Sequence, residues 1–295
     1  MPLRLNLEYL RTFMAVVRCG GIGKAAIQLN LTQPAVTSRI RNLEESLSTS
    51  LFDRVNASLK LTKNGEMLID YAEQFLHLAE LVERDVIDQE GLQGRIKLGV
   101  SDTIAQSWLS EFIQSLNLEY PSLEVYVHTD NSVALRQLLL DCDIDLAILL
   151  GPISEPSVKN IDVPKVKLAW FTSSKHNIDE EKSLKRPITS YARGTKPYRE
   201  LKKLLQENIG SDLSIFPSSS VSVCFKLIES GLCVGALPID LAKEYLNKGT
   251  IKTFDPGWVP RPLQFTVSYV TEPESQLTEA AAKIALKVSK LYEAQ

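Results

Sequence analysis

The sequence predicts a multidomain protein with a small, mostly α-helical head, a long linker helix and a larger α/β body of two subdomains. Residues 1–64 combine helical spacing of apolar residues with an excess of basic side chains. Residues 65–91 contain no proline and keep a seven-residue apolar repeat. Residues 92–295 alternate short strand patterns with helical patterns, which is typical of sheets covered by helices.

The charge of the 295-residue chain is divided unequally. Residues 1–64 contain nine Lys and Arg against four Asp and Glu, a balance of +5, so the remainder carries −8 of the total of −3. A basic head on an acidic body favours a polyanionic partner for the head alone. The apolar runs are shorter than the roughly 18 residues of a spanning helix, and the N-terminus lacks a signal-peptide core. We therefore expect a cytoplasmic protein with no membrane partner.

Three helices are predicted in the first fifty residues. Apolar residues at helical spacing cover residues 7–17, and the pattern stops at Gly20 and Gly21. A second short helix follows over residues 22–29. Thr32 is then a good N-cap for a third helix, with Pro34 in its first turn, where the missing N–H is not needed.

The third helix has two different faces. Val36, Ile40, Leu43 and Leu47 form one apolar stripe that we expect to be buried. The opposite face carries short polar side chains and a proline instead of the long charged residues typical of a solvated helix. Such a thin face fits a nucleic-acid groove, and its donors and acceptors suit base edges and phosphates. The groove-facing residues are predicted to be Gln33, Pro34, Thr37, Ser38 and Arg41.

A small hairpin is predicted after these helices, which makes the head a winged helix-turn-helix. Residues 50–62 read as a short strand, a polar loop and a returning strand that carry Arg54 and Lys60. We expect this hairpin to lie along the nucleic-acid backbone or in the minor groove beside the third helix.

Six short motifs occur in order along the head, namely F-x-x-V, AA-x-x-L, TQPAV, LE-x-x-L, LF-x-R and LT-x-x-GE. Together they resemble the N-terminal domain of LysR-type transcriptional regulators. The resemblance implies a regulator that binds double-stranded DNA as a homodimer or a homotetramer. The sequence "VTSRI" stands where the family frequently has "LSRQI", which moves an arginine to position 39 on the flank of the helix. We therefore expect Arg39 to contact a phosphate.

The linker helix carries an apolar seam with alternating spacings of four and three residues. A heptad seam of this kind predicts a partner helix, most simply the same helix of a second subunit. The alternative is a single helix packed on its own domain. The predicted seam consists of Leu68, Ala72, Phe75, Ala79, Val82 and Val86.

The body is predicted to consist of two subdomains with mainly parallel sheets. Subdomain I covers about 95–162 and 265–295, because the last strand and helix are expected to return to the first half, and subdomain II covers about 163–264. One uninterrupted helix is expected over residues 104–121. Ligands of such folds bind between the subdomains, at strand carboxyl ends and helix N-termini.

Short hydroxyl side chains occur where the predicted helices of the body begin. Each of them alone is explained by N-capping, but together they predict an anion site beside free helix N–H groups, with Arg193 and Lys196 as counter-charges. The predicted effector contacts are Ser101, Thr103, Thr129, Ser132, Arg193, Thr195, Ser219 and Ser220. The segment "ESGLCVGALP" also resembles the LysR family, which implies a periplasmic-binding-protein-like effector domain that binds a small metabolite, often a carboxylate.

Two other function classes compete with a metabolite-controlled regulator. A cytosolic small-molecule-binding protein without a DNA-reading role explains the body but gives the basic head no purpose. An enzyme is the second alternative, but the three histidines are scattered and no G-x-S-x-G, glycine-rich phosphate loop or HExxH occurs. We expect neither a cofactor nor a metal, since "DCDID" lacks the further ligands of a calcium loop. Cys224 and Cys233 are a conceivable redox pair, but their apolar surroundings favour buried, inert thiols.

Overall fold

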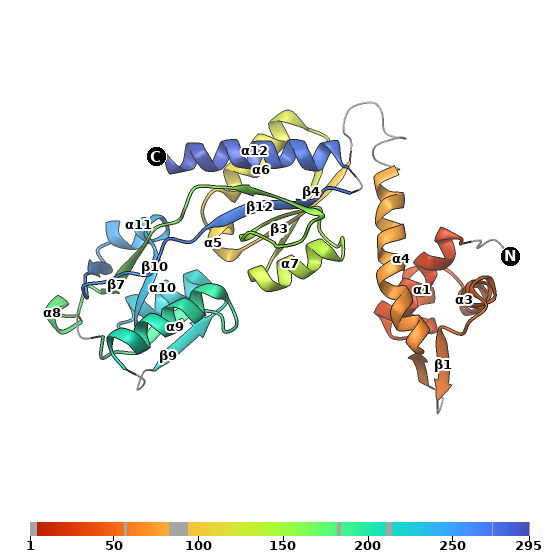
Figure 1. Ribbon diagram of the computed structural model, residues 1–295, viewed down its shortest axis with the longest axis horizontal. Helices are drawn as coiled ribbons and strands as arrows, with labels where there is room; N and C mark the ends of the chain where they lie inside the picture. Colours follow the sequence, from red (N-terminus) through yellow and green to blue (C-terminus); the bar gives the residue numbers. More distant parts are fainter. Residues whose placement is uncertain are drawn as a thin grey trace. The chain divides into compact units, whose positions relative to one another are not determined.

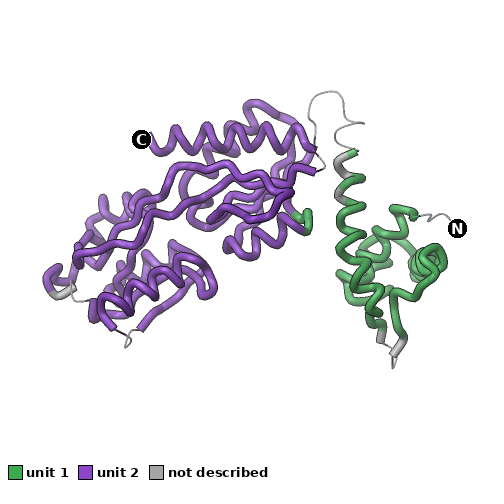
Figure 2. Tube along the Cα trace, in the orientation of Figure 1, with its two compact units in different colours: residues 1–89, 141–143 green, residues 90–140, 144–295 purple. Residues whose placement is uncertain are grey.

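The computed structural model describes residues 5–55, 58–82, 94–181, 184–210, 214–272 and 274–294. The chain divides into two compact units, which are described separately (Figure 2). The first comprises residues 1–89 with residues 141–143, and the second comprises residues 90–140 and 144–295. We refer to the helices and hairpin of the first unit as the head and to the second unit as the body.

The head is a winged helix-turn-helix, as the sequence predicts. Two strands pair antiparallel into the wing, with Phe52 opposite Leu61. The last helix of the head contacts both the first helix and the second strand of the wing (Figure 1). The elements are α1 (Leu7–Cys19), α2 (Ile22–Gln28), α3 (Gln33–Leu47), β1 (Phe52–Val55), β2 (Ser58–Leu61) and α4 (Lys63–Val82).

Local signals set the ends of α3. The Thr32 hydroxyl accepts a hydrogen bond from the Ala35 N–H at 3.3 Å, and Pro34 lies in the first turn. Ser48 ends the helix with a positive φ of 53°. These contacts confirm the predicted start of the third helix.

The motif residues of the head have structural roles. Glu44 of α3 accepts hydrogen bonds from the N–H groups of Leu51 and Phe52 at 2.7 and 3.2 Å, which ties the wing to the helix. The Thr62 hydroxyl accepts from the Gly65 N–H at 3.0 Å and caps α4. A Cβ on Gly65 would lie 2.2 Å from the Leu51 carbonyl oxygen, so only glycine fits there.

Subdomain I of the body is a five-stranded sheet with helices on both faces. The strand order is β4-β3-β5-β12-β6. Apolar side chains of α6 and α12 pack on one face, and those of α7 pack on the other. The elements are β3 (Arg95–Val100), α5 (Asp102–Ala105), α6 (Leu109–Glu119), β4 (Glu124–Thr129), α7 (Ser132–Leu140), β5 (Leu146–Leu150), β6 (Val158–Asp162), β12 (Phe265–Val270) and α12 (Gln276–Glu293).

Subdomain II repeats this three-layer arrangement with the strand order β11-β7-β10-β8-β9. On β7, Trp170 packs with α9 on one face and Phe171 packs with α10 on the other, as the alternation of a strand requires. The elements are β7 (Leu168–Ser173), α8 (Ile178–Glu181), β8 (Ile188–Tyr191), α9 (Lys196–Asn208), β9 (Ile215–Ser218), α10 (Val221–Glu229), β10 (Val234–Pro238), α11 (Ile239–Asn247) and β11 (Ile251–Phe254).

Two segments connect the subdomains, and they pair with each other. Val166 and Leu263 exchange two backbone hydrogen bonds of 3.0 and 2.9 Å in an antiparallel bridge. The segment with Val166 continues into β7, and the segment with Leu263 continues into β12 (Figure 1). Both are inner strands of their sheets. We call this bridge the hinge, because both connections between the subdomains pass through it.

Three details of the body differ from the sequence prediction. The sheets are mixed rather than mainly parallel, because β7 and β12 run antiparallel to both of their neighbours. The single helix expected over residues 104–121 is broken between Ala105 and Leu109 into α5 and α6. Strands β6 and β11 were not predicted, since each is a short strand at a sheet edge without a clear alternating pattern.

Candidate functional site

The exposed face of α3 is the first candidate site. Gln33, Pro34 and Ser38 are exposed, whereas Val36, Ile40 and Leu43 are buried in the head. Thr37 is half-buried, and its hydroxyl donates to the Gln33 carbonyl at 2.9 Å. The helix therefore has the two faces that the sequence predicts, and after Gln33 the first two turns of its outer face carry only small side chains.

The two arginines of α3 have different surroundings. The Arg41 side chain is 78% exposed, and its Nε donates to Glu45 one turn later at 2.7 Å. The Arg39 guanidinium instead donates to Glu8 and Thr12 of α1 at 3.2 and 3.3 Å. This contact ties α3 to α1, so the phosphate contact that the sequence predicts for Arg39 has to share the guanidinium with Glu8. Arg54 lies on β1, where the backbone alone is described.

The apolar surface of α4 is the second candidate site, and it differs from the predicted seam. Ala72 is fully buried and Leu68 packs with it in the head's own core, so the assignment of these two residues to a partner-facing seam is corrected. Ala79 is half-buried, and Val86 lies outside the described residues. The large apolar side chains that remain exposed form a neighbouring stripe with spacings of four, four, three and four residues. This stripe, called the α4 stripe below, consists of Met67, Tyr71, Phe75, Leu78 and Val82.

The cleft between the subdomains is the third candidate site. Five of the eight predicted effector contacts line one cavity there, whereas Thr129, Arg193 and Ser220 do not. Thr129 and Arg193 are exposed elsewhere, and the Ser220 hydroxyl pairs with that of Ser222 at 2.9 Å. The predicted residues in the lining are Ser101, Thr103, Ser132, Thr195 and Ser219.

Two hydroxyl groups in this cleft have no hydrogen-bond partner within the described ranges. Ser101 is only 7% exposed and its Oγ is fully buried without a partner. The Tyr191 hydroxyl is also buried and makes no hydrogen bond within the described residues. Its burial raises the pKa of Tyr191 and keeps the hydroxyl protonated. Because buried polar groups are normally paired, these hydroxyls are candidate contacts for a ligand in the cleft.

The cleft also contains a contact that the sequence did not reveal. The Asp102 carboxylate of subdomain I accepts a hydrogen bond of 2.6 Å from the Val221 N–H at the start of α10 in subdomain II. Asp102 had no sequence signal beyond an acidic residue in a first helical turn. The bond connects residues 119 positions apart and joins the two subdomains across the cleft.

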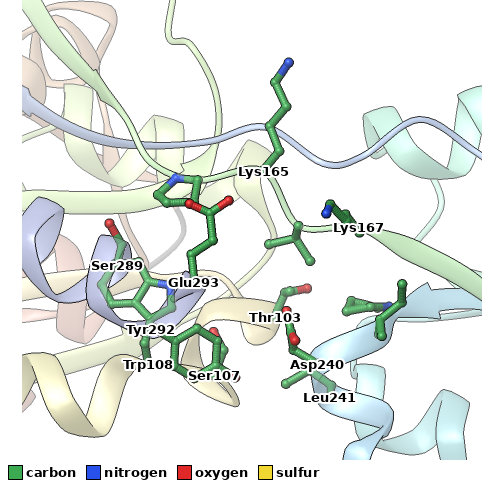
Figure 3. A pocket seen from close by; sticks show the side chains of 14 residues that line it. Thr103, Ser107, Trp108, Lys165, Lys167, Asp240, Leu241, Ser289, Tyr292 and Glu293 are labelled. Atoms are coloured by element: carbon green, nitrogen blue, oxygen red, sulfur yellow. The ribbon is translucent and has the colours of Figure 1, made fainter. Parts of the chain in front are cut away.

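A second, larger pocket of about 170 Å³ opens at the hinge (Figure 3). Trp108, Tyr292 and Leu241 contribute apolar surface, and Lys165 extends away from the pocket. It shares only Thr103 with the predicted effector contacts. The cleft therefore remains the better candidate for the effector.

Two other kinds of site, a reactive cysteine pair and a metal cluster, are not formed by the described residues. Cys224 and Cys233 are free, buried thiols. Burial raises the pKa of Cys224, and it raises that of Cys233 to about 11, so both stay protonated and poorly reactive. Among the residues that the structure describes, no group of three or more His, Cys, Asp and Glu is arranged to hold a metal ion. No helix in these ranges is long and apolar enough to cross a membrane.

Both parts of the chain match known protein families. Residues 7–66 match the bacterial regulatory helix-turn-helix protein of the lysR family, and residues 89–285 match the LysR substrate binding domain. The chain belongs to the LysR family of transcriptional regulators. This LysR-family chain is therefore a DNA-binding regulator with an effector-binding body, and not an enzyme.

A curated relative agrees with this assignment, and solved structures share the fold. The chain is 31% identical over 229 residues to the HTH-type transcriptional regulator YofA of Bacillus subtilis, with 78% of this chain and 80% of YofA covered. The fold resembles full-length OxyR of Pseudomonas aeruginosa with a TM-score of 0.71 at 19% identity, covering 98% of this chain and 95% of OxyR. It also resembles CbnR complexed with its target DNA, with a TM-score of 0.67 at 15% identity and coverage of 97% and 100%.

Proposed function

We propose that this LysR-family regulator acts in the cytoplasm, reads its operator through the exposed face of α3 and is controlled by a small metabolite bound in the cleft between the subdomains. The observation that carries the effector site is the convergence of five predicted residues on the lining of one cavity, among them Ser101 with its buried, unpartnered hydroxyl. Closing or opening the cleft would then change the geometry of paired heads on DNA, which links effector binding to operator binding.

The DNA-reading role of α3 is supported by its charge and shape. Arg41 is the exposed cation on the outer face of the helix, next to the short side chain of Ser38. An arginine that contacts a guanine edge contributes about 1–3 kcal/mol of base discrimination. Its pairing with Glu45 is exposed on both sides and weak, so it gives way to DNA at little cost.

Arg41→Ala is expected to weaken operator binding by about 10-fold or more and to weaken binding to scrambled DNA much less. Fluorescence anisotropy with both DNAs at the same salt concentration measures the two losses. Arg11→Ala removes the same charge from α1, where Arg11 pairs with Glu8, and serves as the matched control. Equal losses on both DNAs would reduce Arg41 to a phosphate contact.

Ser219→Phe is expected to abolish the response of operator binding to the effector while leaving basal DNA binding unchanged. Ser219 is exposed at the cleft lining, so a larger side chain fills the cavity without disturbing the core. The measurement is thermal-shift screening of the full chain against small metabolites, followed by operator binding with each hit. Ser110→Phe, at an exposed serine of α6 outside the cleft, is the control. An unchanged response in Ser219→Phe would move the effector site elsewhere, with the hinge pocket as the next place to test.

The α4 stripe supports a homodimer. Its five large apolar side chains are between 43% and 58% exposed in one chain, a contiguous row that water would otherwise cover. A second copy of the same helix covers such a row symmetrically. We propose that two copies pair through this stripe and place two heads on two half-sites, and that dimers associate further into a tetramer.

A further inference from the structure

The charges that line the cleft point to a ligand of a different class from a simple anion. The cavity lining contains the carboxylates of Asp102 and Asp130 and no Lys, Arg or His among the described residues. The counter-charges expected from the sequence, Arg193 and Lys196, are exposed and lie outside the lining. A purely anionic ligand would meet two carboxylates without a cationic side chain to balance them.

Asp102 already fills the place where an anion would bind on α10. Its Oδ2 atom accepts from the Val221 N–H at 2.6 Å and from Gln106 Nε2 at 2.7 Å. The first turn of α10 has no cap from its own side chains, and the Asp102 carboxylate instead occupies its first N–H group, that of Val221. The Oδ1 atom has no donor in the described part of the chain, which leaves it available to a ligand.

Among the three longer described helices that begin at the cleft, α7, α9 and α10, only α9 has a first turn that no side chain caps. The first turn of α7 is capped by Asn131, whose Oδ1 accepts from the Val133 N–H at 3.0 Å. The first turn of α9 has no side-chain cap, because the Thr195 hydroxyl donates to the Ala192 carbonyl at 2.7 Å instead. Thr195 and Pro197 of this turn line the cavity. The start of α9 is therefore suited to a ligand carboxylate, whereas the start of α10 is not.

We propose, building on the cleft as the effector site, that the ligand is a small zwitterion with the chemistry of an α-amino acid. Its ammonium group binds between Asp102 Oδ1 and the unpartnered Ser101 hydroxyl, and its carboxylate binds the open start of α9. The cavity of about 40 Å³ has room for roughly three waters at about 10–15 Å³ each, which limits the ligand to the smallest members of this class unless the cleft opens. Because Asp102 also bonds to α10, the ligand reinforces a contact between the two subdomains.

The test compares ligands that differ by one group, using the full chain. Glycine, L-alanine and L-serine are the zwitterionic probes, and glycolate and L-lactate are the matched acids without an amino group. Calorimetric titration and thermal shift at constant ionic strength measure binding. We expect L-alanine to bind at least 10-fold more tightly than L-lactate. Tighter binding of L-lactate, or no binding of any zwitterionic probe, overturns the proposal.

Two variants test the assigned atoms. Asp102→Asn keeps an acceptor for the Val221 N–H but loses the charge, so it should weaken L-alanine binding at least 10-fold and remove the preference over L-lactate. Asp162→Asn, an exposed aspartate on β6, makes the same charge change outside the cleft and should have no effect. Ser101→Ala should weaken binding about 5- to 10-fold without destabilising the free protein, since its hydroxyl has no partner there. An unchanged preference in Asp102→Asn contradicts the proposal.

The outcome also separates this inference from the proposed function. If L-lactate binds best and Ser219→Phe abolishes its binding, the cleft is the effector site and the zwitterion class is wrong. If any probe binds equally well to Ser219→Phe, the cleft assignment itself is wrong.

Discussion

Replacing Phe75 and Leu78 of the α4 stripe together with Gln is expected to convert the protein to monomers and to weaken operator binding by at least 100-fold. Each side chain is 43% exposed in the single chain, so a partner helix has apolar surface left to bury. Full burial of such a side chain contributes about 1.5–3 kcal/mol, and a symmetric interface contains each one twice. Even at half of that value, the four side chains together account for about 3 kcal/mol, or roughly 100-fold in the dissociation constant.

Sedimentation at several protein concentrations measures the dissociation constant of the dimer, and fluorescence anisotropy measures operator binding. Glu66→Gln combined with Asp70→Asn is the matched control, because both residues are exposed on α4 outside the stripe. Circular dichroism checks that the variants fold. A dissociation constant that matches the control would mean that the α4 stripe is not the dimer contact.

Gly65→Ala is expected to destabilise the head by about 3 kcal/mol, at the upper end of the effect of overpacking. The new Cβ would lie 2.2 Å from the Leu51 carbonyl oxygen and 2.8 Å from Leu61 Cδ2. The carbonyl cannot retreat easily, because it also accepts from the Thr62 N–H at 2.9 Å. For a domain of this size, 1 kcal/mol shifts Tm by about 4–8 °C, so the head transition should fall by roughly 12–24 °C.

Differential scanning calorimetry of the full chain measures this shift, and the transition of the body should stay unchanged. Gly23→Ala is the matched control, since its Cβ would meet only the flexible end of the Gln33 side chain at 3.1 Å. Replacing a glycine within a helix by alanine stabilises by about 0.5–1 kcal/mol, so this control should be neutral or slightly stabilising. A similar small effect for both substitutions would contradict the role assigned to Gly65.

The head could be predicted from the sequence because its signals are local. Thr32, Pro34 and the apolar stripe of α3 lie within fifteen residues of one another and specify the helix by capping and periodicity. The error on α4 has a physical reason. This helix has one apolar face toward its own head, with Ala72, and a neighbouring apolar face exposed, with Tyr71. Spacing alone does not tell which apolar face the monomer buries.

The cleft could be predicted only in part. The hydroxyl residues at helix starts were found, because N-caps and ligand contacts share the same sequence positions. Asp102 and Tyr191 were missed, because their roles depend on partners far away in sequence, such as the 119-residue separation between Asp102 and Val221. The expectation that Arg193 lines the site failed because proximity to Thr195 along the chain does not fix the direction of an exposed side chain.

The return of the chain to subdomain I has a consequence for how the protein is made. Strand β12 lies between β5 and β6, so the sheet of subdomain I has a gap until residues 265–270 have left the ribosome. At about 5–20 residues per second, the roughly one hundred residues after β6 take about 5–20 s to synthesise. All strands of subdomain II, from β7 to β11, are synthesised within this interval, while β5 and β6 remain with their inner edges unpaired. Subdomain II therefore completes its sheet first during synthesis, and subdomain I, with Asp102 and Ser101, closes last.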